Sequence, residues 1–341
     1  MRATRADVAR RADVSPALVS YVLNGGPRSV SDAARARIEK AIAELDYRPD
    51  SIAQAFRGST TKTVGLLTAS PSNPFFAELA QAVENSVYRR GNTLLIGITD
   101  DDRAREQDYV RTFVDRRVDG ILLLTSHLAR NLALIEPYQI PVVVLDRVRA
   151  EYRSPVSSVH MDNVAGAVRA VEHLQWHGHR RIGCITGNAG DPVSLERVDG
   201  WRRQQNAAGF DADPDLVAYA GFTAPSGREA AHRLLAAVDG ADRPTAIFVA
   251  SDVQALGVLR ACKDIGLSVP DDVAIVSLDG THLSSMLVPS LTAVAQPIES
   301  IADAAIEDLL ARAENPEIAP AAHTFEGRIV IGESCGCQAG S

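Results

Sequence analysis

Seven short apolar runs between residues 63 and 279 constrain the fold more than any other feature of the sequence. The runs span residues 63–69, 93–98, 120–125, 141–146, 181–187, 245–250 and 273–279, and segments of helix length separate them. Strands that are apolar on both faces and alternate with helices are typical of parallel sheets covered by helices on both sides. A stretch of about 280 residues is long for one such domain, so we expect two lobes.

The first 60 residues carry a different pattern, which predicts only helices. We expect a first helix from near Thr4, a tight turn at Asp13, and a second helix capped by Ser15 with Pro16 in its first position. Aspartate tolerates the left-handed backbone that such a turn requires. A third helix is expected to begin at Ser31. Two short helices around a tight turn are typical of a DNA-binding helix-turn-helix, although a plain helical hairpin also fits these residues.

The net charge of −8 argues at first against a nucleic-acid partner, because binding a polyanion needs a positive surface. The charge is unevenly distributed, however. Residues 1–60 carry 10 Arg/Lys and 7 Asp/Glu, whereas residues 61–341 carry 25 Arg/Lys and 36 Asp/Glu. The sequence therefore predicts a small basic segment that can approach DNA and a large acidic one that cannot.

Membrane, secretory and disulfide features are not expected in this chain. The longest apolar runs are far shorter than the roughly 20 residues of a membrane-spanning helix. The first residues interleave charged and apolar side chains without the apolar stretch of a secretory signal. The four cysteines follow no disulfide spacing. We therefore expect a cytoplasmic protein.

The sequence predicts neither an enzyme nor a cofactor or metal site. It contains no P-loop, no G-x-G-x-x-G after the first strand, no G-x-S-x-G and no H-E-x-x-H. His173, His177 and His179 have nearly helical spacing, but no cysteine or carboxylate extends them into a recognised metal-ligand motif, and the end of a surface helix is the plain alternative. The Cys335-Gly336-Cys337 segment is too short and too close to the end to predict a metal or redox site by itself.

A series of motifs, in order along nearly the whole chain, resembles the lac/galactose repressor family of bacterial transcription regulators. In the first 60 residues the motifs are Asp7-Val8-Ala9, Val14-Ser15, Val19-Ser20, Val22-Leu23-Asn24, Val30-Ser31, Leu45 and Tyr47-Arg48-Pro49. In the rest of the chain they are NPFFAEL at 73–79, DG at 119–120, VVLDR at 143–147, DN at 162–163, RVDGW at 197–201, the whole segment 251–280, and ESC at 333–335.

The resemblance implies an all-α DNA-binding domain followed by an α/β domain like the periplasmic binding proteins. It places the helix-turn-helix at residues 1–49, a hinge helix and linker at 50–62, and a two-lobed effector-binding and dimerisation domain at 63–341. The N-terminal lobe is expected at about 63–160 and 296–321, and the C-terminal lobe at about 161–292 and 322–335.

The resemblance also implies which residues contact DNA. They are Thr4, Ser15, Pro16, Ala17, Ser20, Tyr21, Asn24, Arg28, Ile52, Ala53 and Phe56. The family usually has an arginine where Tyr21 stands, and Pro16-Ala17 offers few hydrogen-bond donors, so the operator sequence cannot be predicted. Phe56 replaces the usual leucine of the hinge helix; it either enters the minor groove or packs against the rest of the protein.

Effector-binding residues are likewise carried over from the family. They are Ser70, Phe75, Phe76, Asp146, Arg147, Arg197, Phe222, Ser251, Asp252, Asp279 and Gln296. Most of them follow a predicted strand, where ligands of open parallel sheets bind, although an aspartate there can also cap a helix. Ser70 stands where sugar-responsive members often have aspartate, which leaves the effector class in doubt. The Phe, Asp and Arg residues favour a sugar or related polyol as the first choice, and a nucleoside is the alternative.

The resulting expectation is a homodimeric repressor that binds a pseudopalindromic operator and is released by, or requires, a small effector. A tetramer, an activator role and either sense of effector control stay open. The alternative is a small-molecule-binding protein or enzyme that does not bind DNA and uses its helical N-terminus only for dimerisation.

Overall fold

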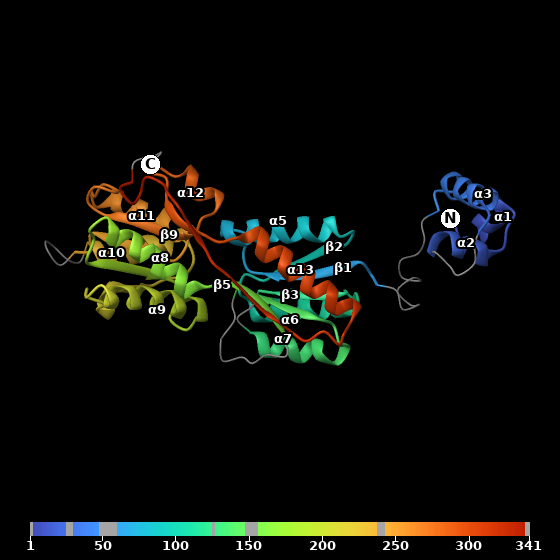
Figure 1. The fold of residues 1–341 in the computed structure, drawn as a ribbon, viewed down its shortest axis with the longest axis horizontal. Coiled ribbons are helices and arrows are strands. Elements are labelled where there is room, and N and C mark those ends of the chain that lie inside the picture. Colours follow the sequence, from blue (N-terminus) through green and yellow to red (C-terminus); the bar gives the residue numbers. More distant parts are fainter. Residues whose placement is uncertain are drawn as a thin grey trace. The chain divides into compact units, whose positions relative to one another are not determined.

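The computed structural model describes residues 3–24, 30–47, 60–124, 127–146, 156–236 and 243–337. The chain forms two compact units, Met1–Thr61 and Lys62–Ser341. We call them the head and the body and describe each separately (Figure 1). The expected hinge helix at residues 50–62 lies almost wholly outside the described residues.

The head contains helices α1 (Arg5–Ala12), α2 (Pro16–Asn24) and α3 (Asp32–Glu44). Asp13 ends α1 with the predicted left-handed backbone, at φ 51° and ψ 57°. The predicted caps are also confirmed, because Ser15 Oγ accepts the Leu18 N–H at 3.3 Å and Ser31 Oγ accepts the Ala34 N–H at 3.4 Å. The three helices pack around a small core formed by Val8, Ala9, Ala12, Val19, Ile38 and Ala41.

The first lobe of the body is built on a parallel sheet with strand order β11-β5-β4-β3-β1-β2. Its strands are β1 (Thr63–Thr68), β2 (Thr93–Ile98), β3 (Gly120–Leu123), β4 (Val142–Leu145), β5 (Ser157–Met161) and β11 (Ala322–Phe325). One face packs against α5 (Pro74–Arg89) and α13 (Ile298–Glu314), and the other against α6 (Arg103–Asp115) and α7 (Leu128–Ile135) (Figure 1).

The second lobe repeats this arrangement with strand order β12-β10-β9-β8-β6-β7. Its strands are β6 (Ile182–Thr186), β7 (Val217–Tyr219), β8 (Ala246–Val249), β9 (Ala274–Asp279), β10 (Thr292–Ala295) and β12 (Arg328–Val330), of which β12 is antiparallel to β10. Helices α8 (Asn163–Trp176) and α9 (Pro192–Ala207) cover one face, and α10 (Ala224–Leu235) and α11 (Asp252–Asp264) cover the other; α12 (His282–Met286) is a single short helix. The predicted fold class is thereby confirmed.

The last lobe boundary differs from the expected one. Residues 322–325 were expected in the C-terminal lobe, but they form β11, which pairs in parallel with β5 from Ala322 opposite Ser158 to Phe325 opposite Met161. Backbone hydrogen bonding therefore holds this segment in the first sheet, and the chain returns to the second lobe only before β12. The two lobes are joined by three crossings, which follow β5, β10 and β11.

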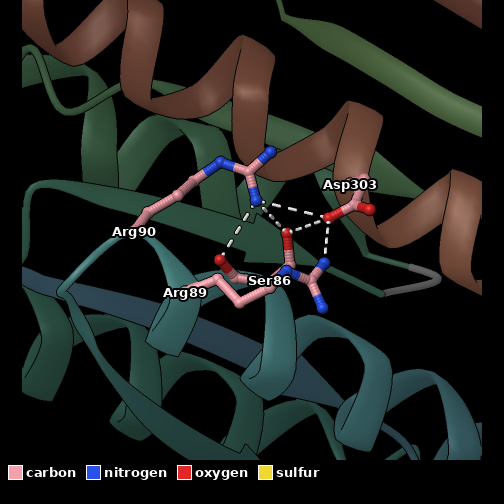
Figure 2. Close-up of polar contacts among 4 residues, drawn as sticks. All are labelled: Ser86, Arg89, Arg90 and Asp303. Atoms are coloured by element: carbon pink, nitrogen blue, oxygen red, sulfur yellow. Dashed lines mark hydrogen bonds and ion pairs between the residues drawn. The ribbon is translucent and has the colours of Figure 1, made fainter.

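Helices α5 and α13 of the first lobe are held together by a polar cluster (Figure 2). Asp303 Oδ1 accepts hydrogen bonds from Ser86 Oγ at 2.6 Å, Arg89 Nη2 at 2.6 Å and Arg90 Nη1 at 3.3 Å. The Ser86 hydroxyl contributes most to lowering the pKa of Asp303, with further help from the two arginines. The carboxylate is therefore the ionised centre of this contact.

Among the described residues, no helix is both long enough and apolar enough to cross a membrane.

Candidate functional site

The carboxyl ends of the parallel strands in the two lobes face a cavity that is lined by residues of both lobes. The first lobe contributes Asn73, Phe75, Phe76 and Asp146, and the second contributes Asp191, Val193, Arg197, Phe222, Ser251 and Asp279. Each of these residues lies at a strand end or near a helix start, where sheet topology concentrates ligand-binding groups. A ligand in this cavity would touch both lobes.

Arg197 supplies the fixed positive charge of the cavity. It lies in α9, is only 3% exposed, and donates from Nε to Asn163 Oδ1 at 3.0 Å and from Nη1 to the Ala250 carbonyl at 2.6 Å. Its guanidinium carbon lies 5.9 Å from the centre of the Phe222 ring. These protein contacts orient the side chain by themselves, which lowers the entropy cost of binding a ligand.

Asp279 is the matching acidic group. It ends β9 with a positive φ of 111°, is 3% exposed, and accepts a hydrogen bond from Gln296 Nε2 at 2.9 Å. Burial raises the pKa of Asp279 well above its usual value, and the nearby charge of Arg197 opposes this rise. Such a buried carboxyl and guanidinium form a polar pair that can recognise neighbouring hydroxyl groups of a ligand.

Aromatic rings form the apolar walls of the cavity. Phe75 and Phe76 pack edge to face, with ring centres 5.3 Å apart, at the start of α5. The side chain of Asn73 caps that helix by accepting the Phe75 N–H at 3.1 Å. On the other side, Phe222 packs so closely on Gly187 that a Cβ at that glycine would lie 2.4 Å from the ring. The absence of a side chain at Gly187 therefore sets the position of Phe222.

The cavity brings together seven of the eleven residues carried over from the family: Phe75, Phe76, Asp146, Arg197, Phe222, Ser251 and Asp279. Three others do not line it. The Ser70 hydroxyl contacts Ser72, and Gln296 lies behind Asp279 as its hydrogen-bond donor. The Asp252 carboxylate accepts hydrogen bonds from Ser277 and Thr281 within the second lobe. Arg147 lies outside the described residues.

Asp252 has a structural environment that explains why it does not line the cavity. Its carboxylate accepts the Ser277 hydroxyl at 2.6 Å, the Thr281 N–H at 2.6 Å and the Thr281 hydroxyl at 2.7 Å. Burial raises the pKa of Asp252, and these hydrogen bonds work against the rise. The side chain thus ties the start of α11 to the end of β9, next to Asp279.

Three lining residues were missed at the sequence level, namely Asn73, Asp191 and Val193. Asn73 and Asp191 each precede a proline and occupy the N-cap position of α5 and α9, respectively. In the sequence, an Asn-Pro or Asp-Pro pair after an apolar run indicates a helix start at a strand end, and this pattern could have identified Asn73 and Asp191.

The head presents the N-terminal part of α2 to solvent. Ser15, Pro16 and Ala17 are exposed, whereas Ser20 and Tyr21 are half-buried. Thr4 is exposed at the start of α1, where its hydroxyl forms a capping box with Asp7. The side chain of Asn24, and all of Arg28, Ile52, Ala53 and Phe56, lie outside the described residues.

Comparison with known proteins agrees with this two-part organisation. Residues 4–50 match the family model for bacterial regulatory proteins of the lacI family, and residues 171–335 match that for a periplasmic binding protein-like domain. The transcriptional repressor PurR of Aliivibrio fischeri strain MJ11 is 35% identical over 318 residues, which cover 92% of this chain and 93% of that protein.

Two solved structures share the fold. The transcriptional regulator CelR in complex with cellobiose is 30% identical, with a TM-score of 0.74 over 98% of this chain and all of that one. The Lac repressor dimer bound to operator and the anti-inducer ONPF is 25% identical, with a TM-score of 0.86 over 98% of this chain and 99% of that one. The chain therefore belongs to the LacI family of DNA-binding transcriptional regulators.

Proposed function

We propose that this regulator is a cytoplasmic repressor that binds a pseudopalindromic operator as a homodimer, and that a small sugar in the body's cavity controls the binding. The observation that carries the effector assignment is the buried pair of Arg197 and Asp279 between aromatic walls. A guanidinium and a carboxyl can hydrogen-bond the hydroxyls of a sugar, while phenylalanine rings cover its apolar face.

The lining of the cavity favours a sugar or polyol as the effector, because polar groups from both lobes lie between phenylalanine rings. A nucleoside is the competing effector class.

Control of DNA binding follows from the position of the cavity between the lobes. Asp146 is fixed to the first lobe and Arg197 to the second, so a ligand that contacts both favours one arrangement of the lobes. The effector acts only through its different affinity for the arrangements that do and do not bind the operator. Either sense of control, release or co-repression, uses the same contacts.

The dimer is supported by apolar side chains at one edge of the first lobe. Strand β2 ends the sheet on that side, and its Ile96 is 46% exposed. Tyr88, on α5, is 75% exposed. An edge strand with exposed apolar residues is a natural place for a second copy to pack. In such a dimer, two heads would read the two half-sites of the operator.

A thermal-shift screen of full-length protein against sugars, polyols and nucleosides tests the effector class, since a ligand that binds only the native state raises its melting temperature. The proposal predicts a hit among monosaccharides or polyols. Arg197→Lys keeps the charge but loses the planar fork, so it should weaken binding of that hit about tenfold or more. Arg202→Lys, on the exposed side of the same helix, is the matched control. An unchanged response in Arg197→Lys would refute the site assignment.

A further inference from the structure

Four side chains with metal-binding atoms meet where the C-terminal segment packs against the end of α8. His173 and His177 are one helical turn apart, and Cys335 and Cys337 follow β12. The ligand atoms of all four residues lie within 4.8 Å of one another. Cys335 is buried, and the other three side chains are half-buried. The group belongs to the second lobe, and none of its members lines the effector cavity.

The spacing of these atoms is close to that of a tetrahedral metal site. Cys337 Sγ lies 3.2 Å from His177 Nε2 and 3.8 Å from His173 Nε2. Zinc bonds of about 2.3 Å to sulfur and 2.0 to 2.1 Å to nitrogen place neighbouring ligands of a tetrahedron about 3.3 to 3.8 Å apart. In both imidazole rings, Nε2 is the atom that faces the Cys337 thiol, and the two distances fit ligands of one shared ion.

The surroundings of the second sulfur also suit a thiolate ligand. Cys335 Sγ accepts a hydrogen bond from Thr292 Oγ1 at 2.9 Å and one from the Cys337 N–H at 3.5 Å. Donors around a ligating sulfur orient it and stabilise its negative charge. The Cys-Gly-Cys spacing puts the second of these donors, a backbone amide, within reach because the chain turns at Gly336, whose φ is 94°.

We propose that His173, His177, Cys335 and Cys337 bind one Zn²⁺ ion. Two thiolates and two imidazoles in a tetrahedral arrangement are typical zinc ligands, whereas Mg²⁺ and Ca²⁺ require oxygen ligands, which this group lacks. Four protein ligands fill the coordination shell, which is the arrangement of a structural rather than a catalytic site. The ion fastens the C-terminal segment to α8, connecting residues 164 positions apart in the sequence.

His179, two residues after His177, is not part of this group. His179 Nδ1 lies 3.0 Å from Thr245 Oγ1 instead. Cys337 is 160 positions from His177 and 164 from His173 in the sequence, so only the folding of the C-terminal segment onto α8 reveals the site. His179 consequently serves as a matched control for the two ligating histidines.

Cobalt binding to the untagged full-length protein, kept reduced, tests the proposal directly. One Co²⁺ per chain should bind with a thiolate-to-cobalt charge-transfer band and the intense visible bands of tetrahedral Co²⁺, and one equivalent of Zn²⁺ should displace it. Trp176 is 75% exposed and its ring centre lies 4.7 Å from that of His177, so bound Co²⁺ should quench its fluorescence. The same titration therefore has two independent optical readouts.

Cys337→Ser and His177→Gln should each weaken metal binding by about 100-fold or more, because each removes one of four ligands. His179→Gln and Cys262→Ala, which alter the same residue types outside the group, should bind Co²⁺ like the natural sequence. Far-UV circular dichroism confirms that each variant is folded. Absence of tetrahedral Co²⁺ in the natural sequence, or a Cys337→Ser variant with an unchanged cobalt spectrum, would overturn the proposal.

Discussion

At the residue scale, the proposed effector site depends on buried polar groups that the protein itself holds in place. Arg197 and Asp279 are each 3% exposed, and their orientation is fixed by Asn163, by the Ala250 carbonyl and by Gln296. Burying charged groups costs free energy.

Asp279→Asn should stabilise the protein at neutral pH while weakening effector binding. The folded-state pKa of Asp279 is raised, so its stabilising contribution is present at low pH and is lost as the pH rises towards that pKa. The gain in melting temperature of Asp279→Asn should therefore grow as the pH rises above about 4. Thermal melts across pH measure this difference. A gain in melting temperature that is the same at every pH would contradict the buried carboxyl of Asp279 as its source.

Gly187→Ala should lower effector affinity by displacing the Phe222 ring. The added methyl would lie 2.4 Å from the Phe222 ring and 2.3 Å from Ser194 Oγ, so the ring must move. Isothermal titration with the effector found in the thermal-shift screen should show a loss of about tenfold or more, because the ring covers the ligand's apolar face. Gly190→Ala is the control, since a Cβ there meets no atom within 4 Å. Equal affinities in the two variants would show that Phe222 does not contact the ligand.

At the scale of helices and strands, the sequence predicted elements that are either strongly apolar or clearly capped. All seven apolar runs form strands, and the caps at Ser15 and Ser31 are present. The five missed strands are β5, β7, β10, β11 and β12. Strand β5 contains Ser157, Ser158 and His160, and β11 and β12 are partly exposed, so none of the three shows a continuous apolar pattern. Strands β7 and β10 are only three and four residues long.

The candidate site was predictable to the extent that it follows from strand ends and from family motifs. The carboxyl ends of strands gave Asp146, Ser251 and Asp279, and the RVDGW motif gave Arg197. The structural role of Asp252 could not be predicted, because its partners Ser277 and Thr281 reach it only through the packing of α11 on β9. The cluster of His173 and Cys337 was missed for the same kind of reason, because tertiary structure alone joins its two halves.

The polar cluster between α5 and α13 predicts a pH-dependent loss of stability. The folded-state pKa of Asp303 is lowered, so its contribution is present above about pH 4 and is lost as the pH falls through the folded-state pKa. Asp303→Asn should lower the melting temperature at pH 7, with the deficit shrinking towards pH 3. Because the carboxylate is partly exposed, the effect should be small and reduced by salt. A deficit that is independent of pH would contradict the role of its charge.

The exposed start of α2 predicts an effect of charge on DNA binding. Ala17 is exposed and lies in the first turn of this helix. Ala17→Glu should weaken operator binding about tenfold or more, through repulsion from the phosphates, whereas Ala17→Lys should not. Fluorescence anisotropy with labelled operator at fixed salt measures both variants. Equal weakening by both substitutions would indicate a steric effect or a different DNA-binding surface.

At the scale of the whole molecule, the chain combines two folding units with opposite charge and different tasks. The described residues of the head form three helices in the basic part of the sequence, and the body is an acidic pair of lobes joined by three crossings. The acidity of the body keeps it from binding the DNA polyanion non-specifically. The overall charge of −8 describes mainly the body and says little about the part that contacts DNA.

Selection of bound fragments from genomic DNA by the full-length protein, followed by footprinting with and without the identified effector, tests this account most directly. We predict protection of an inverted repeat whose half-sites are about one helical turn, or 10 base pairs, apart or a multiple of it, as expected for a two-fold symmetric dimer. Addition of the effector should change the affinity for that site. Failure to bind any fragment specifically, in the presence or absence of candidate sugars and nucleosides, or a protected site without two-fold symmetry, would contradict the account.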